Sequence, residues 1–179
     1  NWNKTLEIFP KLVTEAKNIY LFPNNAATRK VADRASDFYF SPSREKFAFV
    51  NTGLPTGRQA PPQVNIYSTQ NTNDGIILKA PVEFGDYKIS DIIWSNDSKK
   101  ILFSLSRGTA MRWIVADISQ NPPKSFDLTS QLSKLKIRKI NWGYNDDTVF
   151  ISARDPMHAD MLFSYNFLNK TLSELISPD

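Results

Sequence analysis

Apolar and polar positions alternate along most of the chain in short runs, too brief for helices and typical of β-strands. One strand–turn–strand pattern occurs three times, over residues 37–50, 91–107 and 139–152. In each copy an apolar segment ends in an aromatic residue, a polar turn follows, and a second apolar strand begins seven residues after the aromatic position. The aromatic residues are Phe40, Trp94 and Trp142, and the residues seven positions later are Phe47, Ile101 and Val149.

The spacing of the copies predicts the architecture. The aromatic residues lie 54 and 48 residues apart, and each interval has room for four strands. Blades of a β-propeller contain four strands and repeat at about 40–50 residues. The longer first interval contains the loop-like stretch 51–62, with its two Gly and three Pro. We therefore predict an all-β, propeller-like chain of three consecutive four-stranded antiparallel blades, at about 32–80, 87–128 and 137–177. A sandwich or barrel with similar hairpins is the alternative.

The predicted blades do not make a complete ring, because propellers typically have about 4 to 8 blades. We expect them to be part of a larger propeller that further blades or a partner would complete. Residues 1–23 alternate with period two at Leu6 and Ile8 and again at Ile19 and Leu21. They are too short for a domain, so we interpret them as the end of an upstream small β module, with the partial propeller at 24–179. The missing start Met and signal-peptide pattern indicate a piece of a longer protein.

The hairpins resemble the repeat of TolB-type (WD40-like) propellers, in which an aromatic residue precedes Ser-Pro-Asp-Gly-Lys. Residues 40–46 (FSPSREK) and 94–100 (WSNDSKK) keep most of this pattern, and 142–148 keep less. The turn glycine is absent from all three copies. Ser106-Arg107 and the 153–155 segment (ARD) are similar to the strand-end pattern of the family. Prolyl-oligopeptidase-type serine peptidases carry similar repeats, so the resemblance also permits a peptidase propeller.

The first 23 residues are similar to the end of a PEGA domain, a small β module of surface and envelope proteins. The matching residues are Trp2, 6–10 (LEIFP), Val13-Thr14 and 21–23 (LFP). This resemblance implies a bacterial envelope protein whose membrane anchor lies upstream, so that the chain itself would contact no membrane.

Composition removes several classes of function. The absence of Cys excludes disulfides, cysteine nucleophiles and Cys-ligated zinc. The formal charge of +4 is mild for a nucleic-acid-binding protein, so we expect no nucleic acid partner. The only histidine, His158, lies between Asp155 and Asp160, but no Gly-x-Ser-x-Gly nucleophile motif accompanies it. Residues 145–147 (NDD) lack the spacing of a calcium loop and occupy a hairpin-turn position. We therefore expect no catalytic residue, cofactor or metal.

The densest charge cluster is Lys134, Lys136, Arg138 and Lys139. On a strand, alternate residues would project to one side, with Leu135 and Ile137 on the other. Such a cluster suits an anion-binding rim for acidic polysaccharide, a wall polymer or lipid headgroups. It also suits a solvated edge strand whose lysines prevent aggregation. Two further cations, Arg107 and Arg154, lie near strand ends.

The sequence thus favours a non-catalytic propeller module that binds a protein or glycan partner, or serves as a scaffold, in a cell-envelope or extracellular protein. The alternative is the substrate-gating propeller of a prolyl-oligopeptidase-type peptidase whose catalytic domain lies outside this chain.

Overall fold

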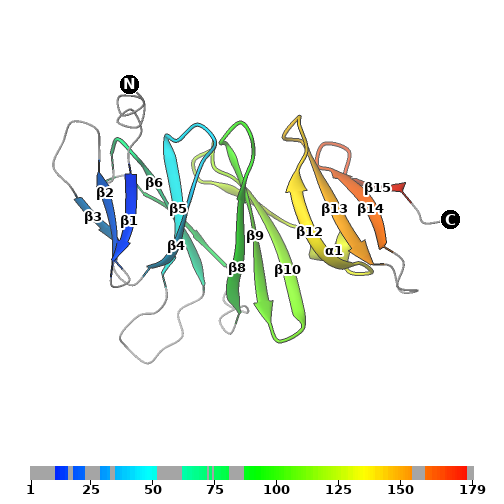
Figure 1. The fold of residues 1–179 in the computed structure, drawn as a ribbon. Coiled ribbons are helices and arrows are strands. Elements are labelled where there is room, and N and C mark those ends of the chain that lie inside the picture. The colour runs from blue at the N-terminus through cyan, green and yellow to red at the C-terminus, as the bar shows by residue number, and fades with distance from the viewer. Residues whose placement is uncertain are drawn as a thin grey trace, which may run out of the picture.

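The structure is a computed structural model that describes residues 11–15, 18–22, 29–32, 35–51, 62–71, 73, 75–80, 87–154 and 160–176. Within these residues the chain forms four separate antiparallel sheets and one short helix. The sheets stand side by side in chain order (Figure 1). None of the helical structure in these ranges has the length and apolar character of a membrane span.

The first sheet has three strands in the order β1-β2-β3. The strand predicted around Ile19 and Leu21 is β2, whereas the one around Leu6 and Ile8 lies outside the described residues. The third strand follows the predicted boundary at residue 23 but pairs with β2, so this sheet extends to Ala32. The strand bounds are β1 Lys11–Glu15, β2 Asn18–Phe22 and β3 Arg29–Ala32.

The other three sheets are the three predicted four-stranded antiparallel units, which we call blades 1, 2 and 3. Blade 1 contains β4 (Ala35–Phe40), β5 (Lys46–Asn51), β6 (Gln63–Ser68) and β7 (Ile76–Lys79). Blade 2 contains β8 (Lys88–Trp94), β9 (Lys100–Arg107), β10 (Ala110–Asp117) and β11 (Lys124–Asp127). Blade 3 contains β12 (Lys136–Trp142), β13 (Thr148–Arg154), β14 (Asp160–Asn166) and β15 (Thr171–Ile176). The short helix α1 (Thr129–Leu132) joins blades 2 and 3.

The hydrophobic core lies between the blades. One cluster of buried side chains joins blades 1 and 2, and a second joins blades 2 and 3. The middle blade is therefore covered on both faces, and its strand β9 is buried continuously from Ile101 to Leu105. The sequence there is a run of apolar residues interrupted by Ser104, whose buried hydroxyl donates a hydrogen bond to the Asp91 carboxylate.

The repeated tryptophans bind neighbouring blades together. The indole N–H of Trp94 donates to the carbonyl oxygen of Tyr39 at 2.9 Å, and that of Trp142 donates to Ile93 at 3.1 Å. Each acceptor immediately precedes the aromatic residue of the previous blade, so the same contact occurs twice. The first copy has Phe40, which has no such donor.

The hairpin turns also dock on one another. The residue four positions after each aromatic has positive φ, at Arg44 (62°), Ser98 (60°) and Asp146 (53°). This is the position where the TolB-type repeat has glycine, the residue for which positive φ carries no steric penalty. The side chain of Ser98 accepts a hydrogen bond from the Ser43 N–H of the preceding blade at 3.1 Å.

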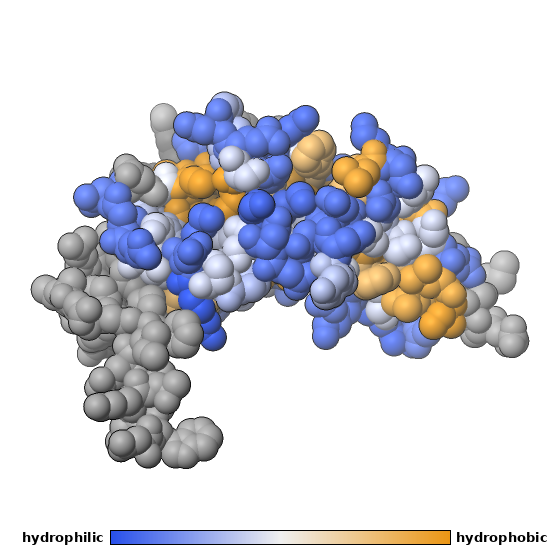
Figure 2. Space-filling model, turned by 90° about the horizontal axis from the view of Figure 1, so that it is seen from above, coloured by the Kyte–Doolittle hydropathy of each residue, from blue (hydrophilic) through white to orange (hydrophobic). Residues whose placement is uncertain are grey.

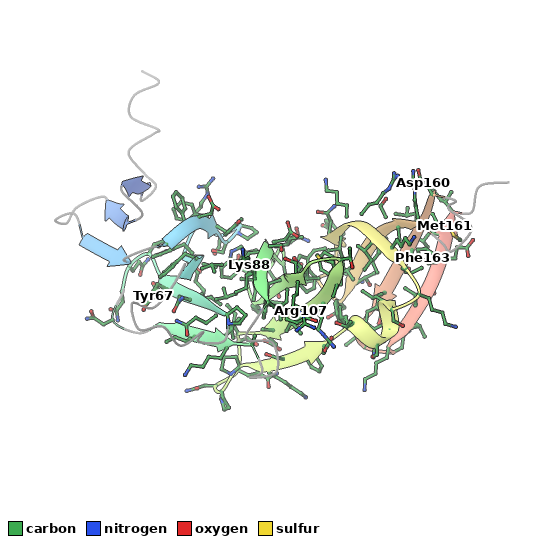
Figure 3. All side chains as sticks on the ribbon, turned by 90° about the horizontal axis from the view of Figure 1, so that it is seen from below. Tyr67, Lys88, Arg107, Asp160, Met161 and Phe163 are labelled. Carbon is green, nitrogen blue, oxygen red and sulfur yellow. The ribbon has the colours of Figure 1, made fainter. Side chains whose placement is uncertain are left out.

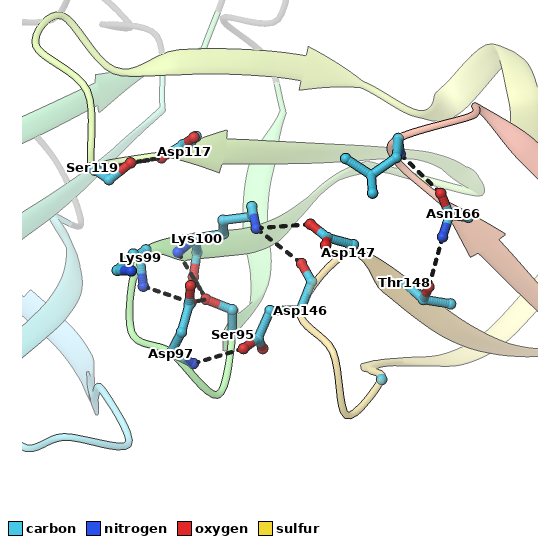
Figure 4. A network of polar contacts seen from close by, with 12 residues as sticks. Ser95, Asp97, Lys99, Lys100, Asp117, Ser119, Asp146, Asp147, Thr148 and Asn166 are labelled. Atoms are coloured by element: carbon cyan, nitrogen blue, oxygen red, sulfur yellow. Dashed lines mark hydrogen bonds and ion pairs between the residues drawn. The ribbon is translucent and has the colours of Figure 1, made fainter.

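In blade 3 the corresponding contact is made by a carboxylate. Asp146 accepts from the backbone N–H groups of Asn96 and Asp97, at 2.6 and 3.0 Å. In the same contact, Lys100 Nζ donates to the Asp146 carbonyl oxygen (Figure 4). The Asp146 side chain thus joins blades 2 and 3 from the position where the family repeat has glycine, and a glycine there could not make this contact.

Candidate anion-binding rim on the third blade

A β-bulge recurs at the same position in the first strand of every blade. In β4, β8 and β12 the cross-strand register shifts directly after Ala35, Ile89 and Ile137, respectively. Each of these residues lies five positions before the repeat aromatic residue. Two consecutive residues there oppose a single residue on the second strand. Bulges redirect side chains that simple alternation would send to opposite faces.

In blade 3 the bulge changes the predicted arrangement of the basic residues. The bulged pair is Arg138-Lys139, between the inward-facing Ile137 and the buried Ile140, and both cations of the pair are exposed. The simple alternation expected from the sequence would have placed Arg138 and Lys139 on opposite faces. The bulge instead adds Lys139 to the exposed cations of β12.

Strand register brings further charges beside this bulge. Lys136 pairs with Arg154 on β13, and Arg154 pairs with Asp160 on β14. Asp160 uses both carboxylate oxygens, one at 3.2 Å from Arg138 Nη1 and the other at 3.0 Å from Arg154 Nε. The structure thus brings together Lys136, Arg138, Lys139 and Arg154, which we call the cationic rim.

The rim is solvated. The side chains of Arg138, Arg154 and Asp160 are 47%, 44% and 60% exposed. Ion pairs of this kind contribute only about 0–1 kcal/mol to stability. Their main effect is to orient the two guanidinium groups, each of which has five N–H donors. Within the described residues, Asp160 is the one carboxylate that pairs with any of the four cations of the rim, so these residues carry an excess of positive charge.

Two of the predicted cations lie elsewhere. Lys134 is exposed in the turn that follows α1. Arg107 ends β9 of blade 2, where its guanidinium lies over the Tyr87 ring, 4.9 Å from the ring centroid. Figure 3 shows Arg107 and Asp160 on different blades. Since β9 and β13 are equivalent strands and run in the same direction in Figure 1, Arg107 and Arg154 end on the same side of the row of sheets.

Blades 1 and 2 carry the opposite charge at the bulge. The position of Lys139 is occupied by Asp37 in blade 1 and by Asp91 in blade 2. Asp91 accepts a hydrogen bond from Ser104 Oγ at 2.8 Å. Burial raises the pKa of the nearby Tyr39 phenol, and the negative charges of Asp37 and Asp91 raise it further. The second residue of the bulge is therefore acidic in blades 1 and 2 and basic in blade 3.

The other candidate residues have structural roles or lie outside the described ranges. Asp146 and Asp147 contact blade 2, where Asp147 Oδ1 lies 3.4 Å from Lys100 Nζ. His158 lies outside the described residues. In the ranges that the structure describes, no three His, Asp or Glu side chains are grouped as metal ligands would be.

Sequence reasoning missed the bulge and the role of Asp160. The bulge has a signal, because a polar pair stands between apolar positions in all three copies: 36–37 (SD), 90–91 (SD) and 138–139 (RK). Two consecutive polar residues break the period of two. The Asp160 contacts had no local signal, since they depend on the pairing of β13 with β14.

Comparison with known proteins supports the fold alone. No protein-family model matches the chain, and comparison with curated proteins finds no significant match. Similar solved structures include an uncharacterised protein of Listeria monocytogenes, with TM-score 0.59 and 13% identity over 94% of this chain. The β-propeller domain of the Trilobed protease of Pyrococcus furiosus has TM-score 0.54 and 16% identity over 80%. The acylaminoacyl peptidase of Pyrococcus horikoshii has TM-score 0.55 and 15% identity over 94%.

These similarities and the three blades define the class of fold. The chain is nearly all-β and has the architecture of part of a β-propeller, as the repeat spacing predicted. It spans 50%, 42% and 29% of the three proteins just described. Identities below one fifth indicate the fold and no particular activity.

Proposed function

We propose that this chain is a non-catalytic binding module of a β-propeller protein, and that its cationic rim recognises anionic groups on a protein or glycan. The observation that carries the proposal is the convergence of Arg138 and Arg154 on Asp160, with Lys136 and Lys139 beside them. Guanidinium groups bind carboxylate and sulfate through paired N–H donors, which gives direction as well as attraction.

The fold suits such a role. A propeller holds loops and strand ends on a rigid platform, where exposed side chains keep their relative positions. The resemblance of the first 23 residues to the end of a PEGA domain supports a bacterial cell-envelope or extracellular protein, with membrane contact only through an anchor outside this chain. The cations form a short row on one blade, so we expect no nucleic acid partner.

The test is binding of a carboxylate polymer, with polyuronic acid as the probe. The double variant Arg138→Ala/Arg154→Ala should lose about tenfold or more in affinity, since hydrogen bonds to charged groups contribute about 1.5–3 kcal/mol. Lys79→Ala is the control, because Lys79 is an exposed cation on β7 of blade 1. Equal loss in both variants would show a diffuse charge effect and would contradict the proposal, as would tighter binding of duplex DNA.

A second candidate function is the propeller of a serine peptidase. The observation that favours it is the similarity to the Trilobed protease propeller and to the acylaminoacyl peptidase. In that case the rim would contact substrate on its way to a catalytic domain. Sequencing the parent gene distinguishes the two, since a Gly-x-Ser-x-Gly motif followed by Asp and His would favour the peptidase.

A further inference from the structure

Blade 3 has one sheet face that differs from the equivalent faces of blades 1 and 2. We call the face toward the next blade in chain order the downstream face. Eight residues after the repeat aromatic, this face carries Ala48 in blade 1, Leu102 in blade 2 and Phe150 in blade 3. The first two are 0% and 1% exposed, because the following blade covers them, whereas Phe150 is 42% exposed.

The burial of whole strands shows the same difference. In β13 the residues Val149, Ile151 and Ala153 are fully buried against blade 2, while the alternate residues are not. The equivalent strand β9 is buried on both faces. Among the described residues, six of the nine exposed large hydrophobic side chains lie in blade 3, on both faces of its sheet and in its turns: Tyr144, Phe150, Leu168, Leu172, Leu175 and Ile176. Figure 2 shows apolar atoms at this right-hand end of the molecule.

The two covered faces show what fits such a face. In both cases the cover is a four-stranded blade of the same repeat. Its tryptophan donates to the carbonyl of the residue before the previous aromatic. The residue four positions after that tryptophan, Ser98 or Asp146, accepts hydrogen bonds through its side chain from backbone N–H groups of the previous blade's hairpin turn.

Blade 3 presents the matching backbone. Asn141 occupies the position of the acceptors Tyr39 and Ile93, and Tyr144-Asn145 occupies that of Asn96-Asp97, whose N–H groups bind a carboxylate. The turns share their geometry as well. Ser95 N–H donates to Lys100 O at 2.9 Å, and Gly143 N–H donates to Thr148 O at 2.7 Å.

We propose that the downstream face of blade 3 is a docking surface for another four-stranded blade of this repeat. That blade would carry tryptophan at the repeat aromatic position, bonded to the Asn141 carbonyl. Four residues later it would carry an acidic or hydroxyl side chain, bonded to the N–H groups of Tyr144 and Asn145. Leu162 is half-buried on β14 and pairs with Ser152, so it shares the face of Phe150. These two side chains would form the centre of the new core. The proposal is independent of the cationic rim.

The experiment supplies such a blade from the protein's own sequence. A second copy of residues 128–176 is joined directly after Ile176. The linker 128–135 then follows the last strand of blade 3 (β15), just as it follows the last strand of blade 2 (β11) in the natural chain. The chain has no cysteine, so Phe150→Cys in the original blade 3 provides a single thiol for maleimide labelling. The extended chain should label about tenfold or more slowly than the unextended chain with the same substitution, since reaction then requires local opening.

The control and the contacts are tested in the same way. Lys79→Cys, on the outer strand of blade 1, should label equally fast in both chains. Replacing Trp142 by Phe and Asp146 by Ala in the added copy alone should restore much of the labelling rate.

A second extended chain, carrying a copy of residues 87–127 instead, covers the case in which the first added blade fails to fold. Unchanged labelling in both extended chains would overturn the proposal. Maleimide labelling of the unextended chain that slows as protein concentration rises would also overturn the proposal. It would show that a second copy of the whole protein covers this face.

Discussion

Replacing Trp94 by Ala tests the packing between blades 1 and 2. The indole is 8% exposed, and its N–H donates to the Tyr39 carbonyl oxygen at 2.9 Å. Truncating a buried tryptophan to alanine costs about 3–5 kcal/mol, because transfer free energy is lost and a cavity remains. The hydrogen bond accounts for about 1 kcal/mol of this. We therefore expect Trp94→Ala to lower the free energy of unfolding by about 3–5 kcal/mol.

The assay is urea unfolding followed by far-ultraviolet circular dichroism, with the free energy obtained by linear extrapolation. Trp94→Phe is the matched variant, because the first copy carries Phe40 at the same repeat position. It keeps most of the packing and loses the donor, so we expect a loss of about 1–2 kcal/mol. A loss below about 1 kcal/mol for Trp94→Ala would refute the packing of Trp94 between blades, since truncation of a tryptophan packed in a core typically costs about 3–5 kcal/mol.

Three further outcomes follow from the hairpin turns. Asp146→Ala should destabilise the protein by about 1–3 kcal/mol in urea unfolding, and Asp146→Gly should cost about 1 kcal/mol less, because φ there is 53°. Equal losses would mean that backbone strain is unimportant. Arg44→Gly should be neutral or stabilising by up to about 1 kcal/mol, since Arg44 has φ of 62° and its side chain lies over Phe40; a clear loss of stability would contradict this. Burial raises the pKa of Asp97, but hydrogen bonds from Ser95 and Lys99 and the charge of Lys100 outweigh burial and lower the pKa overall. Asp97 therefore stabilises the fold above its unfolded pKa of about 4, and this contribution is lost as pH falls through the lower folded value. Asp97→Asn should flatten the fall of the urea midpoint below about pH 4, and an unchanged pH profile would contradict the assignment.

The blades were predictable because their signals are local. An aromatic residue, a polar turn and a second apolar strand recur within each copy, and the four strands then follow at regular intervals. The three four-stranded units predicted from the repeat are present as the sheets at 35–79, 88–127 and 136–176.

The contacts between blades were not predictable in the same way. The missing turn glycine weakened the family resemblance, yet at Ser98 and Asp146 its absence has a structural cause: both side chains bond to the preceding blade. Those contacts join residues about 50 positions apart, so no local pattern indicates them. The sequence pattern of one repeat therefore does not indicate whether the residue that replaces glycine contacts the neighbouring blade.

The candidate site was predicted in composition and only partly in geometry. Lys136, Arg138, Lys139 and Arg154 do lie together, but through a β-bulge and a shared carboxylate that strand alternation did not indicate. Arg107 belongs to another blade because it follows a different hairpin. Charge density along the sequence therefore located the rim, and strand pairing decided its membership.

The most direct test of the cationic rim is to map its ligand by nuclear magnetic resonance. Amide shifts of the isotope-labelled protein would be followed during titration with an oligouronate. We predict shifts that saturate at residues 136–139, 154 and 160–161, disappear in Arg138→Ala/Arg154→Ala, and persist in Lys79→Ala. Shifts that centre on blades 1 or 2, or that survive the double arginine substitution, would contradict the assignment of anion recognition to this rim.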